Sequence, residues 1–598
     1  MASLVLEDGS DDVMVVLTCI DRNEQDDFSH NQDEDAVMIS TVDVYNWNFP
    51  SVLKHRTIKV KAQRNRLIEH SSYFHGLLGG NFGNPDLEIL VQWNQPTFLS
   101  LLASLFGSPL DVTSESFLSL FEGALYFGME TIISKCMMWL TKAISVNGVP
   151  LLQLNDLLSI WEFGSELVNN YLPELCTTYL AKNFIWAMSC SSFVDVPYDL
   201  LLSSTKHPNL TVDSEMQLCD ALLIWISANK EQYTEDCYIN LLKQIRISLL
   251  PLWFASGKKT YESLSMCCNE SYSGVITLLK QPFTPRMNAL QDNELLNLRI
   301  RLTELTQRVD ISCCTQMNPA ILLLSVLPLS LNLEPQLRIK FEKSLINHES
   351  INAFPWTKWS NLTFEAVHEI DISNCPMLPL KVAIDIISYS FPSLRKLKAA
   401  NHLSFKTLDV MQLVKKCPLL CDIDLTVDVS PVISTQVSIL SSFLPTNTPG
   451  SFSIHWHSNH SNITKLILEG RNDVEGINLS CFSKLMSQAY MLKNLCLRDT
   501  EVVDDVLFNF LGSSLEVLDV SNTKVSSAVL AHVIGRNPGL KCLKTRGCNN
   551  LLHKETKSLF FEVCKLEEIS VGSRRTEMAS WNFSFTGVCG SLFSGDFR

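Results

Sequence analysis

The sequence predicts a multi-domain protein with an α/β domain, then an all-α domain, and finally a C-terminal α/β solenoid of stacked repeats. Three observations predict this fold class. Strand-like and helical stretches alternate over residues 37–145, and helical apolar spacing dominates residues 148–258. A motif of the form LxxLxLxx, followed by Cys, Thr or a near equivalent, recurs over residues 351–575. A chain of 598 residues is long enough to form several such cores.

The segment 1–36 is predicted to be an acidic, flexible N-terminus, because it is rich in Asp, Glu, Asn and Ser. One apolar island within it, "VMVVLTC", is read as a lone strand. The domain that follows, residues 37–145, is expected to contain strands at "DVYNW" and "TIKVKA". The basic run that includes Lys59 and Lys61 is interpreted as a solvated strand edge rather than a nucleic-acid site.

The stretch "TIKVKAQRNRLIEHSSYFHGLL" resembles the BTB/POZ pattern of a strand that leads into a helix, with Leu67, Ser71 and Tyr73 at matching positions. The resemblance continues through "LEILVQWNQPTF" towards residue 145. It implies that the domain binds a cullin-3-type cullin and self-associates as a homodimer. The cullin-binding residues it implies are Phe74, Leu77 and Phe82. Asn84 stands where many cullin-binding members carry Glu.

Residues 148–258 resemble the BACK domain that follows BTB in many adaptors. The matching features are a polar helix start at Asp213, a mid-helix Trp225 and the segment "IRISLLP". We expect Asp213 to act as the N-cap, because its carboxylate can accept the first free amides, and Trp225 to lie in the core. Residues 259–350 are predicted to be a helical linker region, with an amphipathic helix in "DNELLNLRIRLTELTQRV".

The repeat is clearest in "LEVLDVSNT", residues 515–523. Copies begin at Val367, Leu394, Leu420, Ile463, Leu492, Leu515, Leu540 and Leu566. Consecutive copies begin 23–29 residues apart, apart from one step of 43 residues that is either an insertion or a degenerate repeat. This is the period of leucine-rich repeats, in which each strand–helix unit buries its apolar face against its neighbours. Residues 576–598 depart from the pattern and are assigned as a C-terminal tail.

Side chains that flank the fourth and sixth motif positions are expected to point outward, onto the concave strand face. They form a candidate substrate-binding surface of Glu369, Asp371, Lys396, Lys398, Asp422, Asp424, Lys465, Arg498, Asp519, Lys544 and Arg546. Glu469, Asn494, Ser521, Glu568 and Ser570 complete the set. The first repeats alternate in sign, which favours either charge-complementary recognition of a protein or simple solubility.

The composition and the absence of certain motifs argue against several classes of function. A formal net charge of -15 argues against nucleic acid and anionic membranes as partners. Without a cationic leader or a long apolar span, we expect an intracellular protein of the cytoplasm and/or nucleus. The 19 cysteines are then expected to be reduced and structural, with no metal and no cofactor. No P-loop, dinucleotide, zincin or hydrolase motif occurs, so we expect a protein without catalytic activity.

The order BTB, BACK, leucine-rich repeats resembles plant BTB/POZ proteins described as F-box/LRR-like. The resemblance implies a substrate-specific adaptor of a cullin-3/RING E3 ubiquitin ligase, with the repeats recruiting the protein substrate. Two alternatives stay open. One is a dimeric scaffold or transcriptional co-regulator without ligase function, and the other is a receptor gated by a small molecule.

Overall fold

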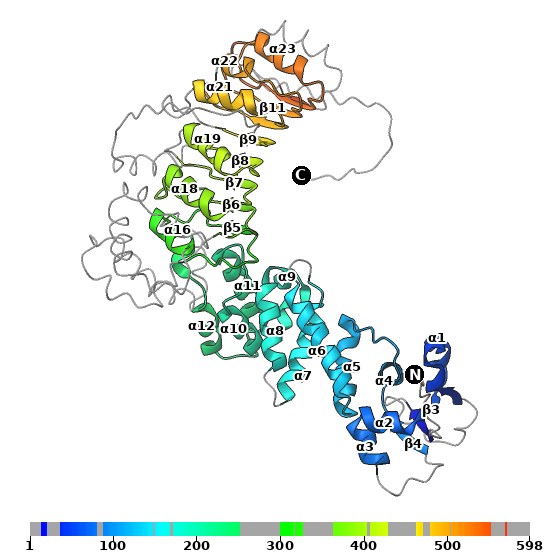
Figure 1. The fold of residues 1–598 in the computed structure, drawn as a ribbon. Helices are drawn as coiled ribbons and strands as arrows, with labels where there is room; N and C mark the ends of the chain where they lie inside the picture. The colour runs from blue at the N-terminus through cyan, green and yellow to red at the C-terminus, as the bar shows by residue number, and fades with distance from the viewer. Residues whose placement is uncertain are drawn as a thin grey trace, which may run out of the picture. The chain divides into compact units, whose positions relative to one another are not determined.

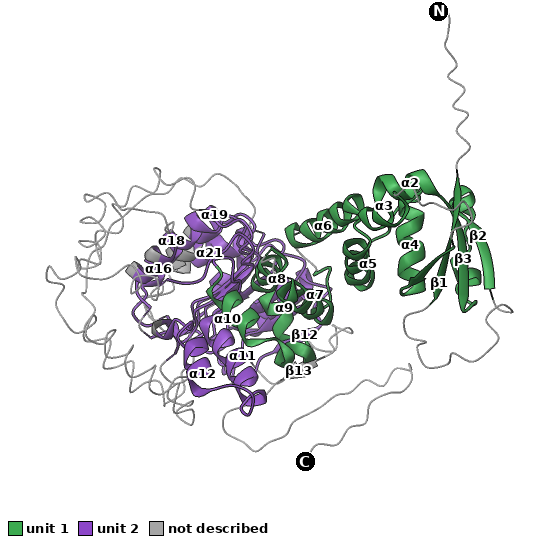
Figure 2. Cartoon of the chain, turned by 90° about the horizontal axis from the view of Figure 1, so that it is seen from below, with its two compact units in different colours: residues 1–207 green, residues 208–598 purple. Residues whose placement is uncertain are grey.

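The computed structural model describes residues 13–20, 36–79, 88–146, 150–167, 171–251, 299–315, 317–326, 363–402, 407–427, 462–469, 479–502, 504–551 and 568–570. The chain divides into two compact units, residues 1–207 and 208–598, which are described separately below (Figure 2).

Unit 1 contains a four-stranded sheet of order β2-β3-β1-β4. Strand β1 (Met14–Ile20) pairs antiparallel with β3 (Thr57–Gln63) and parallel with β4 (Glu88–Gln92), while β2 (Ala36–Ser40) adds in parallel at the outer side of β3. The strand read in "VMVVLTC" is confirmed as β1, but it is an interior strand of the sheet and not a lone one. Leu17 and Cys19 are fully buried there, because strands flank β1 on both sides.

The helices of unit 1 follow the BTB-like and BACK-like stretches. In order they are η1 (Thr41–Asn46), α1 (Phe49–Val52), α2 (Arg64–His70), α3 (Ser72–Leu78), α4 (Gln95–Leu105), α5 (Ser114–Tyr126), α6 (Glu130–Ser145), α7 (Leu154–Glu166), α8 (Tyr171–Lys182), α9 (Phe184–Met188), η2 (Ser191–Asp195) and α10 (Tyr198–Lys206). The strand predicted at "DVYNW" is wrong, because η1 covers most of it. The Ser40 side chain caps η1 by accepting the Val42 amide, and the Trp47 indole donates to the Ser40 carbonyl oxygen at 2.9 Å.

Unit 2 begins with the last BACK-like helices, α11 (Glu215–Ala228) and α12 (Glu235–Leu242), and the short η3 (Ile247–Leu249). A nine-stranded sheet follows, with its strands in chain order. The strands are β5 (Arg308–Asp310), β6 (Glu369–Asp371), β7 (Lys396–Lys398), β8 (Asp422–Asp424), β9 (Lys465–Ile467), β10 (Asn494–Cys496), β11 (Val517–Asp519), β12 (Cys542–Lys544) and β13 (Glu568–Ser570). Each predicted repeat supplies one strand, and all neighbouring strands are parallel.

The helices between these strands all lie on one side of the sheet (Figure 1). They are α16 (Pro319–Val326), α18 (Leu380–Ser390), α19 (Thr407–Lys416), α21 (Leu479–Gln488), α22 (Asp504–Phe508) and α23 (Ser527–Arg536). The fourth motif position forms one buried row, in which Leu495 pairs in register with Leu518 and Leu518 with Leu543. A single apolar core between strands and helices is the arrangement expected of a solenoid.

Strand β5 is an additional repeat that the sequence reading missed. The helix predicted to run to residue 309 is wrong in its described part, because residues 299–307 contain bends and turns and β5 follows them. Thr306, Val309, Ile311 and Cys314 repeat the motif spacing, with Thr in place of the first Leu, and all four are buried. The repeats therefore begin before residue 351.

The long step between β8 and β9 adds no strand to the sheet. Asp422 pairs directly with Lys465 across the two strands, so an insertion rather than a degenerate repeat lies between them. The added residues 428–461 fall outside the described residues, as do 252–298 and 327–362 of the predicted linker and the whole predicted tail, 576–598.

The motif-ending cysteines have a structural role. The Cys375 thiol donates to the Ile311 carbonyl oxygen of the preceding repeat at 3.2 Å, and the Cys548 thiol donates to Val520 in the same way at 2.9 Å. Burial raises the pKa of the Cys375 thiol well above its ordinary value. These cysteines satisfy backbone acceptors at the end of the strand, where water does not reach.

A buried polar junction joins α11 to the first repeat strand. Ser214, rather than the predicted Asp213, is the N-cap of α11, because its hydroxyl accepts the Gln217 amide. The next residue, Glu215, forms an ion pair with Arg301 at 2.7 Å, with the two side chains only 4% and 11% exposed. Its second carboxylate oxygen accepts the Arg246 amide at 3.0 Å. This half of the BACK-like region thus covers the open N-terminal end of the sheet, which a repeat array needs to have covered.

Candidate interaction surfaces

A patch of partly exposed apolar side chains lies on α3 and the end of α5 in unit 1. Tyr73 and Leu77 are four residues apart on α3 and therefore share one face. The Tyr73 ring lies 5.5 Å from that of Tyr126, centroid to centroid. Leu77 and Tyr126 are 50% and 55% exposed. We refer to Tyr73, Leu77 and Tyr126 as the α3 patch.

The predicted cullin-binding residues differ in their exposure to solvent. Leu77 is exposed and belongs to the α3 patch. Phe74 is fully buried and stacks on Phe127, with ring centroids 5.9 Å apart, so the prediction that it contacts a partner is wrong. Adjacent apolar residues on a short helix cannot all face the core, and the sequence alone did not distinguish them. Phe82 and Asn84 fall on residues 80–87, outside the described part of the chain.

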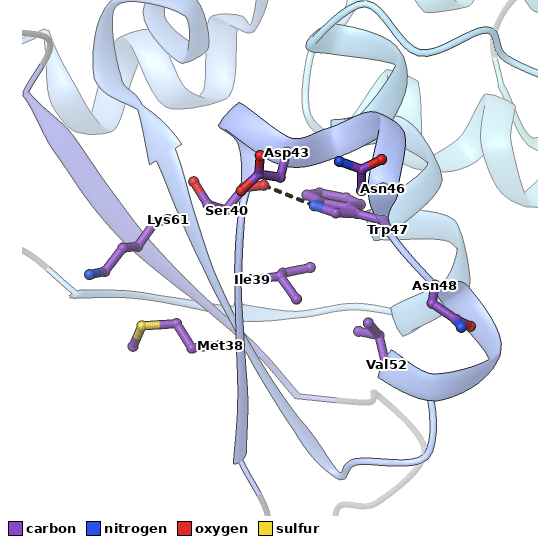
Figure 3. Close-up of a pocket in the computed structure, with 9 residues that line it drawn as sticks. All are labelled: Met38, Ile39, Ser40, Asp43, Asn46, Trp47, Asn48, Val52 and Lys61. Atoms are coloured by element: carbon purple, nitrogen blue, oxygen red, sulfur yellow. Dashed lines mark hydrogen bonds between the residues drawn. The ribbon is translucent and has the colours of Figure 1, made fainter.

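A cavity of about 360 Å³ lies between the edge strand β2 and η1 (Figure 3). Its lining mixes apolar and polar side chains: Met38, Ile39, Ser40, Asp43, Asn46, Trp47, Asn48, Val52 and Lys61. The sequence reading did not anticipate it, because the segment was taken as a strand. The Trp47 indole is tied to the Ser40 backbone, which closes one side of the cavity.

The outer face of the repeat sheet in unit 2 carries the third and fifth motif positions, since the fourth faces the helices. On its first three strands, β5 to β7, these positions are all charged, and all except Asp371 form ion pairs with one another. Glu369 lies 3.8 Å from Arg308, 3.9 Å from Lys396 and 3.3 Å from Lys398. Burial is the main reason that the pKa of Asp371 is raised, and the Ser373 hydrogen bonds and nearby Lys398 oppose it. This end of the face therefore satisfies much of its own charge.

From β9 to β12, the outer face carries uncharged side chains among the charged ones. The fifth position is Ile467 in β9 and Cys496 in β10, and the two are register partners. At the third position, Val517 of β11 pairs with Cys542 of β12. All four side chains are partly exposed. The sequence reading missed them because it searched each repeat for a charged residue. Counting the third and fifth positions strictly in every copy would have found them.

The polar and charged residues predicted on the outer face of the later repeats lie at two kinds of position. Asp424, Lys465, Asp519 and Lys544 lie within strands, as expected. A second group follows its strand at the seventh position: Glu469, Arg498, Ser521 and Arg546. Arg498 pairs with Glu469 at 3.5 Å. The side chains of Glu568 and Ser570 are outside the described set, although β13 itself is placed.

Asp residues at the fifth position share one local role. Asp310, Asp371, Asp424 and Asp519 each accept, through Oδ1, the backbone amide two residues later, at 3.0–3.1 Å. This bond ends the strand and engages one of the two carboxylate oxygens. In Asp310 the second oxygen pairs with Arg308 at 3.6 Å.

In the described residues, no helix has both the length and the apolar character needed to cross a bilayer. Within the same residues, no group of three or more His, Cys, Asp or Glu side chains is placed to hold a metal ion.

Comparison with known families fits this architecture. Residues 51–144 match the BTB/POZ domain and residues 157–257 match BACK, "BTB And C-terminal Kelch". The chain is therefore a BTB–BACK protein that continues into a parallel repeat sheet. It is 37% identical to the BTB/POZ domain-containing protein FBL11 of Arabidopsis thaliana over 669 aligned residues, covering 94% of this chain and 70% of that protein. The chain belongs to the family of this plant protein.

More distant relatives share only the N-terminal part. Kelch-like protein 3 of Mus musculus is 24% identical over 197 residues, which are 32% of each chain. The human Kelch repeat and BTB domain-containing protein 12 is 20% identical over 190 residues, 32% of this chain and 29% of that protein. The yeast Rad7–Elc1 crystal structure matches 48% of this chain and 76% of its own, at 15% identity and a TM-score of 0.25. That score is too low to support an argument about fold.

Proposed function

We propose that this protein is a substrate-specific adaptor of a cullin-3/RING E3 ubiquitin ligase and that its repeats are leucine-rich repeats. One chain combines a BTB domain that exposes the α3 patch with a nine-stranded repeat sheet whose outer face is polar and partly apolar. A surface for a ligase scaffold and a separate surface for a substrate are the minimum that a recruiting subunit needs. Membership of the FBL11 family supports the same proposal.

The proposed mechanism is proximity. The BTB domain binds the cullin, and the repeats hold the substrate, so substrate lysines meet the charged conjugating enzyme at a high effective concentration. The adaptor itself makes and breaks no bonds. Leu77 and Tyr126 are proposed cullin contacts, together with Phe82, and the outer sheet face is the proposed substrate contact.

The test is a pull-down of the full chain with the amino-terminal domain of cullin-3. We expect saturable binding that Leu77→Asp weakens at least tenfold, because a carboxylate at the centre of an apolar contact loses its water without gaining a partner. Phe82→Asp is expected to act in the same direction. Val42→Asp is the matched control, since Val42 is 67% exposed but lies on η1, outside the patch.

The outcomes separate the ligase reading from a dimeric scaffold. If the wild-type chain forms a dimer in sedimentation equilibrium but does not bind cullin-3, the adaptor proposal is wrong and the scaffold reading replaces it. If Val42→Asp and Leu77→Asp weaken binding equally, the α3 patch is not the contact surface.

A further inference from the structure

The outer sheet face of β8 to β11 has a pattern that the rest of the face lacks. The strand register places Asp424 beside Ile467, Ile467 beside Cys496, and Cys496 beside Asp519. Two partly exposed, uncharged side chains therefore lie between two carboxylates in one row across four strands. We refer to these four residues as the DICD row.

The two carboxylates in the DICD row lack ion pairs. Among the described residues, no cation lies within ion-pair distance of Asp424 or Asp519, whereas Glu369 on the earlier strands has three such neighbours. Each Asp uses Oδ1 for the backbone amide of residue 426 or 521, which leaves Oδ2 as an acceptor. The row thus combines two uncharged side chains at its centre with a carboxylate at each end that forms no ion pair.

Charged side chains of both signs surround the DICD row. In strand register, Lys398 of β7 lies beside Asp424 and Lys544 of β12 lies beside Asp519. Near the centre, Glu469 lies close to Asp424, Asp499 and Asp519, and these three carboxylates raise its pKa together with burial, which is the largest cause. Arg498 pairs with Glu469 and Asp499 and lowers that pKa. A cation that reaches the second carboxylate oxygen of Asp424 or Asp519 would gain electrostatic free energy.

The separation between Asp424 and Asp519 further restricts the kind of partner that can bind. Adjacent strands lie about 4.8 Å apart, so the two aspartates, three strand steps apart, are separated by about 14 Å. An extended polypeptide advances about 3.4 Å per residue, which places residues i and i+4 about 14 Å apart with side chains on the same face. Residue i+2 then lies over Ile467 and Cys496.

We propose that the DICD row recognises an extended segment of the recruited protein with the pattern basic-x-apolar-x-basic. This inference rests on the proposed substrate-binding role of the outer sheet face. The two cations pair with Asp424 and Asp519, and the apolar side chain packs on Ile467 and Cys496. The segment crosses the strands at right angles.

The experiment uses the full chain and a dye-labelled 13-residue peptide with Lys-Ser-Leu-Ser-Lys at its centre and Gly-Ser flanks, followed by fluorescence anisotropy at low salt. We expect Asp424→Asn and Asp519→Asn each to weaken binding about threefold and the double variant about tenfold, with binding falling as salt rises. Asparagine retains the Oδ1 acceptor that ends the strand, so these variants keep the local fold. Asp385→Asn, which removes a partly exposed carboxylate on helix α18 rather than on the outer sheet face, should leave affinity unchanged.

Two further peptides test charge and spacing. Replacing both Lys by Glu should abolish binding, and shortening the spacing to Lys-Ser-Leu-Lys should reduce it to the level of one ion pair. No binding of the first peptide, equal binding of the Lys and Glu peptides, or an equal loss in Asp385→Asn would each overturn the inference. Its failure is distinct from failure of the adaptor proposal, because cullin-3 binding is measured on the BTB domain and does not involve the DICD row.

Discussion

The buried junction at Glu215 gives the most demanding prediction. Replacing Glu215 by Gln keeps the shape of the side chain and an oxygen that can accept the Arg246 amide, but it removes the negative charge. Arg301 then stays buried without its counter-ion, and the Arg246 guanidinium, whose pKa is already lowered to about 10 by burial and by nearby Arg301, loses the carboxylate that favours its charged form. Loss of one partner from a buried ion pair costs about 3–5 kcal/mol.

The measurement is hydrogen–deuterium exchange of the full chain, read in the peptides that cover α11 and β5. Since 1.4 kcal/mol corresponds to a factor of ten, we expect these amides to exchange at least about a hundredfold faster in Glu215→Gln. The control is Asp385→Asn. Its ion pair with Lys416 is as short, at 2.6 Å, but the two side chains are 24% and 45% exposed, so the cost should stay below about 1 kcal/mol.

A second substitution tests the cause. Adding Arg301→Met to Glu215→Gln removes the uncompensated charge and replaces it with an apolar side chain, so much of the lost protection should return. The reasoning is refuted if Glu215→Gln is no more harmful than Asp385→Asn, or if Arg301→Met adds a further loss of similar size.

Three further predictions concern unit 2. Burial is the main cause of the raised pKa of Asp213, so this carboxyl keeps its proton to a higher pH in the folded chain than in the unfolded chain, and its contribution to stability falls as pH rises through that range. Asp213→Asn should therefore stabilise the chain at pH 7 and lose this advantage below about pH 3. A stabilisation that grows on acidification would contradict the expected sign. In native protein at pH 8, iodoacetamide should modify the partly exposed Cys237 long before Cys375, because Cys375 is buried and its thiol pKa is raised. Peptide mass spectrometry measures both rates. Equal rates would mean that the repeat around Cys375 opens readily. Gly547→Ala should cost more than about 1 kcal/mol in urea unfolding, because φ is +75° and the added Cβ would lie 2.0 Å from Asn522 Oδ1. Adding Asn522→Gly, which removes that oxygen and tolerates the φ of +57° at residue 522, should recover part of the loss but not the part due to φ at residue 547.

The repeat strands were predictable because each copy carries its own periodic signal. In the copies that contain β6 to β12, the fourth and sixth motif residues are all buried, and all of them are apolar except Thr545. Strand β5 escaped because Thr306 replaces the first Leu, although it is equally buried. Burial of a threonine depends on its hydrogen bonds, here to residue 303, and such bonds are not visible in an apolar pattern.

The sheet of unit 1 was less predictable because its pairing is non-local. Strand β1 pairs with residues 57–63 and 88–92, far along the chain, and acidic segments flank it on both sides. The apolar island therefore predicted a strand, but local composition could not show that β3 and β4 pair with it on both sides. The same limit applies to Phe74 and Leu77, since only the packing of α3 against Phe127 decides which side chain is buried.

The division of the BACK-like region between units bears on how the proposed adaptor would work. Helices α11 and α12 belong to unit 2, and Glu215 ties α11 to Arg301, just before the first repeat strand. Leu249 of η3 also lies in the same apolar core as the repeats. Within unit 2, helices α11 and α12 and the first repeats are therefore packed together, and on the proposed function this packing holds the repeats to the BACK-like helices. Weakening the Glu215 junction should thus reduce substrate ubiquitination while leaving cullin-3 binding intact, and an equal loss of both would argue that the junction acts only through overall stability.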